Sequence, residues 1–157
     1  MRDKTFEKIK NYIVENQDRS YRLAYSYLKN REDALDAVQD AVCRALEHGG
    51  SLRNAEAVKT WFYRILVNEC LRLLKERKQQ PAEDMEGLDI PYEEKGFEPA
   101  DDLEHMLGYL DQDTQTIIRL RFYEELSIME ISRITGLNLN TVKARLYRGL
   151  KKLRINI

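Results

Sequence analysis

The three prolines of this chain lie close together, and their clustering constrains the fold more than any other sequence feature. Pro81, Pro91 and Pro99 fall within nineteen residues, in a segment that also holds two glycines and seven acidic side chains. Proline fixes φ and removes a hydrogen-bond donor, so this composition predicts a linker. A chain of 157 residues has room for two small domains. We expect them at 1–78 and 101–157, joined by an acidic linker at 79–100.

Charge is distributed unevenly along the chain. Residues 1–78 carry 16 basic and 12 acidic side chains. Residues 79–113 carry one basic and 12 acidic side chains, and residues 114–157 carry nine basic and three acidic ones. The net charge of −1 therefore hides two basic blocks separated by an acidic one. This pattern is typical of a protein whose two outer blocks face a polyanion.

The overall composition excludes several classes of protein. Hydrophobic residues make up 43% and charged residues 34%, which indicates a globular chain that is neither disordered nor embedded in a membrane. No signal peptide is visible, and no stretch approaches the roughly 20 apolar residues of a membrane span. Cys43 and Cys70 are too few for a disulfide framework or a zinc site. We expect a cytoplasmic protein without a metal site.

Apolar residues recur at three- and four-residue spacing on both sides of the linker, which predicts an all-α fold. In the first domain we expect helices near 6–16, 20–28, 31–48 and 56–78, with Asn30 as the N-cap of the third. The apolar face of that third helix is predicted to comprise Ala34, Ala37, Val38, Ala41, Val42, Ala45 and Leu46. The apolar face of the fourth is predicted to comprise Val58, Phe62, Ile65, Leu66 and Leu73.

The second domain carries the pattern of a helix-turn-helix. Asp111 is a candidate cap for a helix that runs through Phe122. Ser127 and Glu130 have the spacing of a capping box, which begins a short helix. A turn at 136–138 then leads into a final helix from Leu139 to about Arg154.

Charge on the final helix is confined to one side. Val142, Leu146, Leu150 and Leu153 share the opposite, apolar side, and residues 139–154 include six Lys or Arg but no Asp or Glu. Basic side chains that displace counterions from phosphates explain such a face, and the start of the helix can reach base edges in the major groove. The alternative is a solvated cationic helix at a chain end.

Two faces of the first domain also indicate binding. Helical geometry groups Trp61, Arg64 and Asn68 with two further cations, and rings beside cations suit single-stranded nucleic acid. The alternative is that the aromatic residues belong to the core. An acidic face on the helix at 31–48 is either solvated or a dock for a basic protein surface.

Three stretches together resemble a known family. The strings are DALDAVQDAVCRAL, TWFYRILVNECLRLLKERK and LDQDTQTIIRLRFYEELSIMEISRITGLNLNTVKARLYRGLKKLR. In this order they are similar to the extracytoplasmic-function group of bacterial RNA polymerase sigma factors. The resemblance covers nearly the whole chain outside the linker. It implies a promoter-recognition subunit that is not an enzyme and needs no cofactor.

The resemblance also implies roles for particular residues. The first domain would dock on the coiled-coil clamp of the polymerase β′ subunit through Asp36, Gln39 and Asp40. The melted minus-ten element would contact the loop at 49–57 and the next helix, through Leu52, Arg53, Trp61, Arg64, Asn68, Arg72 and Lys75. The duplex minus-thirty-five element would contact Asn140, Thr141, Lys143, Ala144, Arg145, Tyr147, Arg148 and Lys151.

Further partners follow from the same resemblance: the polymerase β flap, and a separate anti-sigma factor as regulator. The acidic linker would run through the polymerase toward the RNA exit path. The wording of the loop at 49–54, together with Asn140 and Ala144, departs from the commonest family pattern. These departures leave the base preferences open.

Two other functions compete with this interpretation. A stand-alone helix-turn-helix regulator would use its first domain to bind a ligand or to dimerise, and would need an apolar pocket or a self-complementary helix face. A nucleic-acid enzyme would need clustered acids, histidines or metal ligands, whereas His48 and His105 stand alone.

Overall fold

The computed structural model describes residues 2–78 and 104–156, and within these ranges the chain is helical without a strand. The N-terminal half comprises α1 (Arg2–Glu15), α2 (Gln17–Leu28), α3 (Arg31–Glu47) and α4 (Val58–Lys78), with short 3-10 turns η1 (Gly49–Ser51) and η2 (Ala55–Ala57) before α4. The C-terminal half comprises α7 (Gln112–Ile118), the π-helical turn η3 (Arg119–Tyr123), α8 (Ile128–Thr135) and α9 (Leu139–Asn156). The all-α, two-domain prediction is confirmed, while the predicted linker at 79–100 lies outside the described residues.

The predicted caps begin and end the helices. Asn30 Oδ1 accepts a hydrogen bond from the Asp33 amide at the start of α3 (2.9 Å). Ser127 and Glu130 form both bonds of the capping box of α8, and Gly136 ends that helix with φ of 79°. Glycine reaches this left-handed conformation without steric cost. Asp111 precedes α7 as predicted, but its side chain makes no capping bond.

Small residues let α3 approach its neighbours closely. Ala34, Ala37, Ala41 and Ala45 are fully buried along one side of the helix, which packs against α2 and α4. Leu46 was predicted on this side, yet 41% of its surface is exposed. It lies one residue after Ala45, and a step of about 100° turns its side chain away from the buried row.

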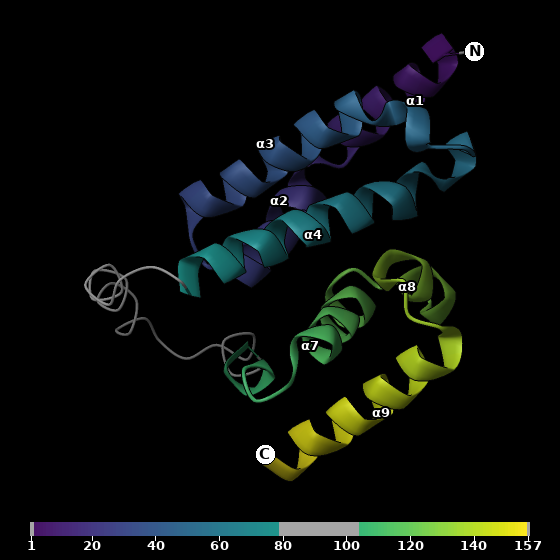
Figure 1. Ribbon diagram of the computed structural model, residues 1–157. Helices are drawn as coiled ribbons and strands as arrows, with labels where there is room; N and C mark the ends of the chain where they lie inside the picture. Colours follow the sequence, from purple (N-terminus) through teal and green to yellow (C-terminus); the bar gives the residue numbers. More distant parts are fainter. Residues whose placement is uncertain (1, 79–103, 157) are drawn as a thin grey trace.

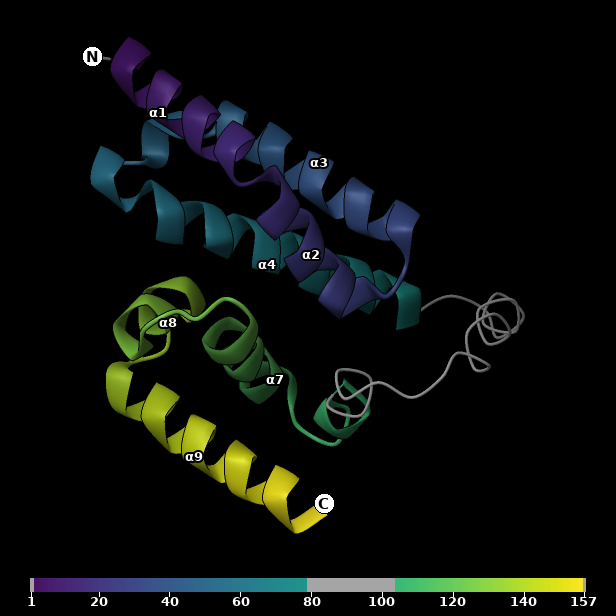
Figure 2. The same ribbon diagram turned by 180° about the vertical axis from the view of Figure 1, so that it is seen from behind.

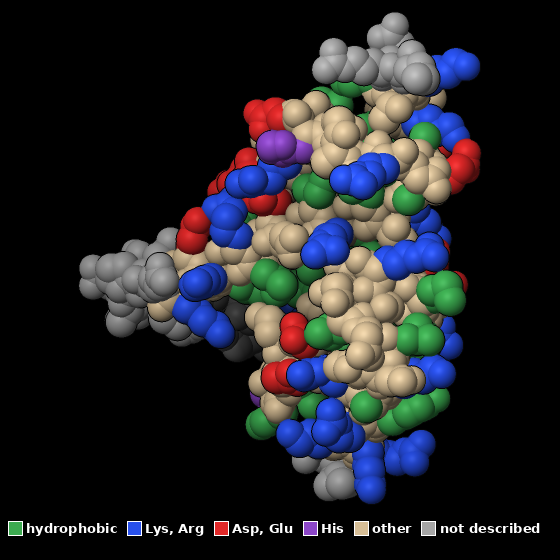
Figure 3. All heavy atoms as spheres, turned by 45° about the vertical axis from the view of Figure 1, so that its right-hand side comes forward, with side chains coloured by type: hydrophobic (Ala, Val, Ile, Leu, Met, Phe, Trp, Pro, Cys, Tyr) green, Lys and Arg blue, Asp and Glu red, His purple; other side chains and the backbone are tan. Residues whose placement is uncertain are grey.

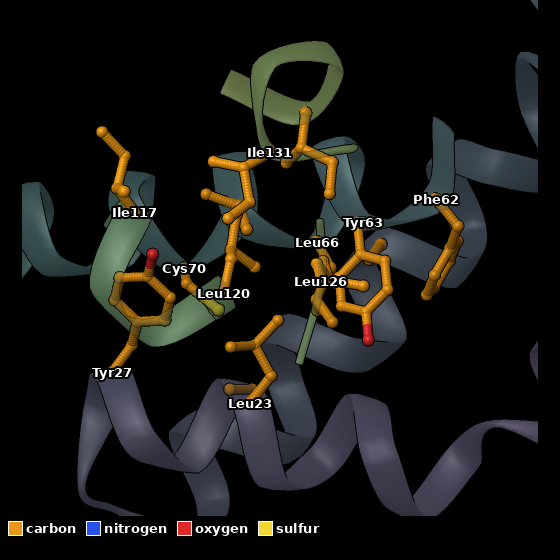
Figure 4. Close-up of a cluster of buried hydrophobic side chains, with 14 of the residues drawn as sticks. Leu23, Tyr27, Phe62, Tyr63, Leu66, Cys70, Ile117, Leu120, Leu126 and Ile131 are labelled. Carbon is orange, nitrogen blue, oxygen red and sulfur yellow. The ribbon is translucent and has the colours of Figure 1, made fainter. Parts of the chain in front are cut away.

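The two halves share one apolar core. α4 lies between the N-terminal helices and the C-terminal half in both views (Figures 1 and 2), and it contacts α2, α3 and α8. Tyr63, Leu66 and Cys70 of α4 lie in the same buried cluster as Leu120 and Ile131 from the C-terminal half (Figure 4). This contact is called the seam below.

Polar groups accompany the apolar contacts of the seam. Tyr27 Oη and Thr116 Oγ1 lie 2.6 Å apart, and Tyr63 Oη donates to Glu124 Oε1 over 2.6 Å. Arg119 stacks over the Tyr27 ring at 4.7 Å from its centroid. Burial raises the pKa of both tyrosines and of the Glu124 carboxyl above their usual values. Burial thus disfavours the charged form of each of these groups.

Two surface ion pairs flank the same contact. Lys29 Nζ lies 2.5 Å from Glu104 Oε1, and Lys59 Nζ lies 3.2 Å from Glu130 Oε2. In each pair the cation belongs to the N-terminal half and the carboxylate to the C-terminal half. The seam thus has an apolar centre, buried hydrogen bonds and a partly solvated charged edge.

We predict that Gly149→Ala destabilises the protein. An added Cβ would lie 2.7 Å from Thr114 Cγ2 and 3.1 Å from Ile118 Cδ1, so α9 and α7 would have to move apart. Overpacking of this kind costs about 1–3 kcal/mol and exceeds the gain in helix propensity. Urea unfolding measures the change, with Gly50→Ala as the control because nothing lies within 4 Å of its added Cβ. Equal midpoints for the two variants would contradict the close approach of α7 and α9.

Candidate nucleic-acid interface

The turn before α9 fixes the direction in which that helix leaves α8. Ser132 Oγ donates to the Leu137 carbonyl (2.6 Å), and Asn138 Oδ1 accepts from the Thr141 amide (2.9 Å). Val142, Leu146 and Leu153 are buried on the inner side of α9. The outer side of the helix is thereby turned to solvent.

Most residues predicted to read duplex DNA lie together on this outer side. Thr141 is half-buried, and Tyr147 is 67% exposed. The other exposed members of the predicted set are Asn140, Lys143, Ala144, Arg148 and Lys151. Figure 3 shows Lys and Arg side chains over the whole visible face, including its lower part, where the C-terminal helices lie. The arrangement presents cations, amide and hydroxyl groups, and an aromatic ring on one helix.

Arg145 differs from the rest of the predicted set. Its Nη1 donates to Asp111 Oδ2 (2.7 Å), and its Nε is buried without a hydrogen-bond partner. A hydrogen bond from Thr114 and the Arg145 guanidinium hold the pKa of Asp111 below its usual value. Arg145 lines an open groove of about 540 Å³ between α7 and α9, together with Arg148 and Lys151. Arg145 therefore stabilises α9 from its side, against α7.

The strip predicted to bind a single strand lies on α4 beside the seam, and its Arg64 guanidinium reaches the turn at Gly136, where an added Cβ would lie 3.5 Å from Nη2. Arg64, Asn68 and Lys75 are exposed, and Trp61 is half-buried. Trp61 Nε1 donates to Ser51 Oγ over 3.4 Å, which ties the loop before α4 to the helix. Ring, amide and cations are thus aligned along one face.

Arg72 belongs to this strip by spacing but is engaged in ion pairs. Its guanidinium reaches Glu69, Glu76 and Asp40, at 2.9, 2.5 and 3.1 Å. Glu69 is buried and also pairs with Arg44 of α3. Arg72, which was expected to contact DNA, and Asp40, which was expected to contact polymerase, therefore form an ion pair with each other.

Leu52 departs from its predicted role. Only 7% of its surface is exposed, and it belongs to the hydrophobic core. Its neighbour Arg53 is exposed and free to meet a ligand. Because η1 and η2 fold the loop against α1, the apolar side chain turns inward.

The acidic face of α3 is accessible as predicted. Asp36, Gln39 and Asp40 are all exposed on the outer side of the helix. Asp40 Oδ2 accepts the hydrogen bond from Arg72, so Asp36 carries the more available charge.

Sequence reasoning missed the residues of the seam. Tyr63, Val67 and Cys70 are buried on α4, at spacings of four and three residues. That spacing is itself a helical signal, and it shows that α4 is apolar on a second side. The carboxylates that face Lys59 and Tyr63 lie more than sixty residues away in the chain, so no local pattern reveals them.

The described residues contain neither a metal-binding cluster nor a membrane-spanning helix. Within 2–78 and 104–156, no three His, Cys, Asp or Glu side chains are grouped so that they could hold a metal ion. No helix in this part of the chain is long and apolar enough to cross a membrane.

Comparison with known proteins gives two family matches in one chain. The model for sigma-70 region 2 matches residues 12–80, and the model for sigma-70 region 4 matches residues 100–153. The chain is a sigma factor of the sigma-70 family. It is 45% identical to the RNA polymerase sigma factor SigV of Bacillus subtilis over 148 residues, which cover 92% of this chain and 88% of that protein. It is also 30% identical to the ECF RNA polymerase sigma factor SigW of Bacillus subtilis over 155 residues, covering 88% and 82%.

Solved structures support the fold of this sigma factor. RpoE, in complex with the anti-sigma factor NepR from Bartonella quintana, matches with a TM-score of 0.71 at 23% identity, covering 92% of this chain and 93% of that one. CnrH, in complex with the cytosolic domain of CnrY, matches with a TM-score of 0.70 at 20% identity, covering 94% and 85%.

We predict that Leu52 acts through stability and not through contact. Leu52→Ala removes a buried side chain and should lower the free energy of unfolding by about 2 kcal/mol. Arg53→Ala, on the exposed neighbour, should change it by less than about 0.5 kcal/mol. Urea unfolding of both variants measures the difference. An unchanged midpoint for Leu52→Ala would mean that this loop does not pack as described.

Proposed function

We propose that this sigma factor directs core RNA polymerase to specific promoters, helps to melt the minus-ten region and so initiates transcription. The observation that carries the proposal is the presence, in one chain, of two separate exposed faces suited to nucleic acid. One is the α4 strip and the other is the outer side of α9. Both faces fall within the matched sigma-70 regions.

The first domain, at 1–78, would capture the melted strand. Unpaired bases stack on aromatic rings while cations follow the phosphates, which suits Trp61 and Arg64 on adjacent turns of α4. Asn68 offers an amide that can hydrogen-bond to a base edge. Opening the duplex costs about 1.4 kcal/mol per base-pair step, and each stacked base returns about 1–3 kcal/mol. Binding energy alone therefore supports melting, and the chain needs no catalytic group.

The second domain, at 101–157, would read the duplex minus-thirty-five element. Asn140 and Lys143 lie in the first turns of α9, the part of a recognition helix that reaches base edges. Arg148 and Lys151 lie farther along the same side, where the helix passes the phosphate backbone. Together they supply both the sequence-dependent and the sequence-independent parts of binding.

Core polymerase would hold the two domains at the promoter spacing, with 79–100 as the connection. Each domain alone makes few phosphate contacts, so each binds DNA weakly. Fixing both on one scaffold raises the effective concentration of the second contact. The acidic face of α3 is suited to the β′ clamp, and the second domain to the β flap.

A separate anti-sigma factor is the expected regulator, since the sigma factor RpoE was solved in complex with the anti-sigma factor NepR. We place the protein in the cytoplasm with the polymerase, and we propose no enzymatic activity. The stand-alone regulator is not favoured, because the chain carries regions 2 and 4 together.

The direct test is transcription with purified components. Core polymerase supplemented with this chain should start RNA synthesis at discrete sites on a genomic promoter library, whereas core polymerase alone should not. Mapping the 5′ ends of the transcripts then locates the minus-ten and minus-thirty-five elements. No specific start sites on any template would refute the proposal.

We predict that Arg148→Ala weakens upstream DNA binding selectively. Loss of one exposed cation on α9 should reduce holoenzyme affinity for the promoter by about 10-fold, the effect of about 1.4 kcal/mol. Affinity for core polymerase should not change. Footprinting of the minus-thirty-five element measures the effect, with the exposed Arg133→Ala on α8 as the control. Full upstream protection by Arg148→Ala would count against the assignment.

We predict that Asp36→Arg impairs docking on core polymerase. Reversing the most available charge of the acidic face should replace attraction by repulsion and weaken the complex by about 10-fold or more. Glu7→Arg makes the same charge change on the exposed surface of α1 and serves as the control. Surface plasmon resonance against core polymerase measures both. Equal affinities would exclude this face as the dock.

A further inference from the structure

The first helix has no part in the binding faces described so far. α1 contacts α3, α4 and both 3-10 turns of the loop at 49–57 (Figures 1 and 2). No residue of α1 belongs to either proposed nucleic-acid face, and the sigma-70 region 2 match begins only at residue 12. The helix nevertheless places the buried side chain of Ile9 and the ion-paired side chain of Lys8 against that loop.

We propose that α1 positions the loop at 49–57 for capture of the melted strand, and that Ile9 and Lys8 are the positioning residues. The proposal rests on the proposed function, in which this loop and α4 contact the minus-ten element. Neither residue would touch DNA, because each acts through the loop. The loop is then ordered before the strand arrives, which lowers the entropic cost of binding.

An apolar contact holds the start of the loop. Ile9 is 1% exposed, and a Cβ built on Gly49 would lie 3.2 Å from its Cδ1. A side chain at position 49 would therefore press on a residue that is itself packed in the core. Leu52 of the same loop is buried as well. The start of the loop is thus fixed at both ends, and the exposed Ser51 lies between them.

A polar contact holds the end of the loop. Lys8 Nζ donates to Glu56 Oε2 over 2.9 Å, so α1 reaches η2. Within the loop, Asn54 Oδ1 accepts from the Glu56 amide (3.0 Å), and the Asn54 carbonyl accepts from the Ala57 amide (2.8 Å). Both groups of the ion pair are exposed, so the pair adds little stability. What it restricts is the position of η2 relative to α1.

The loop in turn positions the ring that would stack on a base. Ser51 Oγ donates to the His48 carbonyl (2.8 Å) and accepts from Trp61 Nε1 (3.4 Å). One hydroxyl group therefore ties the end of α3, the loop and α4 together. A displacement of η1 from α1 would move this hydroxyl group and remove the hydrogen bond of the indole. Ile9 and Trp61 are therefore connected through η1.

The first test moves one methyl group across the apolar contact. Gly49→Ala adds a methyl group that presses on Ile9 Cδ1, and Ile9→Val removes that Cδ1 atom. The double variant therefore has nearly the original volume at the contact. If Gly49→Ala acted only within the loop or directly on DNA, Ile9→Val would not restore function. The two single variants and the double variant form a double-mutant cycle.

The second test exchanges the charges of the ion pair. Lys8→Glu places a carboxylate opposite Glu56, and the double variant Lys8→Glu with Glu56→Lys restores the pair in reverse. Lys10→Glu makes the same charge change on the exposed surface of α1 and serves as the matched control.

The measurements separate melting from binding. Permanganate reactivity of unpaired thymines gives the ratio of open to closed complex for holoenzyme on a promoter located by mapping of transcript 5′ ends. Protection of the minus-thirty-five element and affinity for core polymerase are the reference values. A merely structural role of α1 would lower the midpoint of urea unfolding without changing the ratio of open to closed complex.

Hydrogen–deuterium exchange of the 49–57 peptide reports the order of the loop in the free chain. The amides of Ser51 and Leu52 donate to the carbonyls of His48 and Gly49 (2.9 and 3.1 Å), so both amides are protected while η1 is formed. This measurement needs neither polymerase nor promoter.

Gly49→Ala should lower the ratio of open to closed complex by about 10-fold, the effect of overpacking by one methyl group, and the double variant should restore it to within about 3-fold. Lys8→Glu should lower the ratio by about 3-fold, and the charge exchange should recover it, with no change in Lys10→Glu. Upstream protection and polymerase affinity should stay constant in all variants.

An unchanged ratio in Gly49→Ala would overturn the proposal, as would a loss that Ile9→Val fails to restore. Equal effects of Lys8→Glu and Lys10→Glu would overturn the role of Lys8. If no form of the chain starts transcription, the proposed function fails, and exchange in the free chain still tests the contact. Faster exchange in Gly49→Ala that the double variant reverses would support positioning of the loop by α1, and unchanged exchange would overturn it.

Discussion

The two-sided burial of α4 determines the rest of the structure. One side of this helix packs on α2 and α3, and a second side packs on the C-terminal half. A third side remains for Trp61, Arg64 and Asn68. Because a helix has little surface left after two such contacts, the nucleic-acid strip must be narrow and continuous. Ion pairs from Glu69 to Arg44 and from Arg72 to Asp40 join α4 to α3, and so set the direction in which that strip faces.

Buried polar groups are placed where the two halves meet. Tyr27, Thr116, Tyr63 and Glu124 are all buried, and each has its partner across the seam. A typical buried hydrogen bond contributes only about 1 kcal/mol net, whereas an unpaired buried group costs about 1–3 kcal/mol. Such pairs therefore add little attraction but penalise every other alignment of the halves. Specificity in this contact comes from the polar groups and affinity from the apolar ones.

Sequence patterns predicted what local chemistry determines. Spacing predicted the helices, and the Ser127 capping box and the turn at Gly136 formed as expected. The errors concern tertiary contacts. Leu46 extends a periodic pattern yet is exposed at the end of α3, and Leu52 lies in a polar loop yet is buried. The pairing of Arg72 with Asp40 joins residues 32 positions apart, which periodicity within one helix cannot reveal.

Core polymerase would strengthen the binding of this sigma factor to DNA, which each domain alone binds weakly. Because coupling between two binding events is reciprocal, polymerase and promoter DNA each favour the binding of the other to the sigma factor by an equal free energy. Promoter DNA would then raise the affinity of polymerase for the sigma factor by the same factor as polymerase raises the affinity of the sigma factor for DNA. Holding both domains on one scaffold is sufficient for this reciprocity, because linkage does not depend on how the coupling arises.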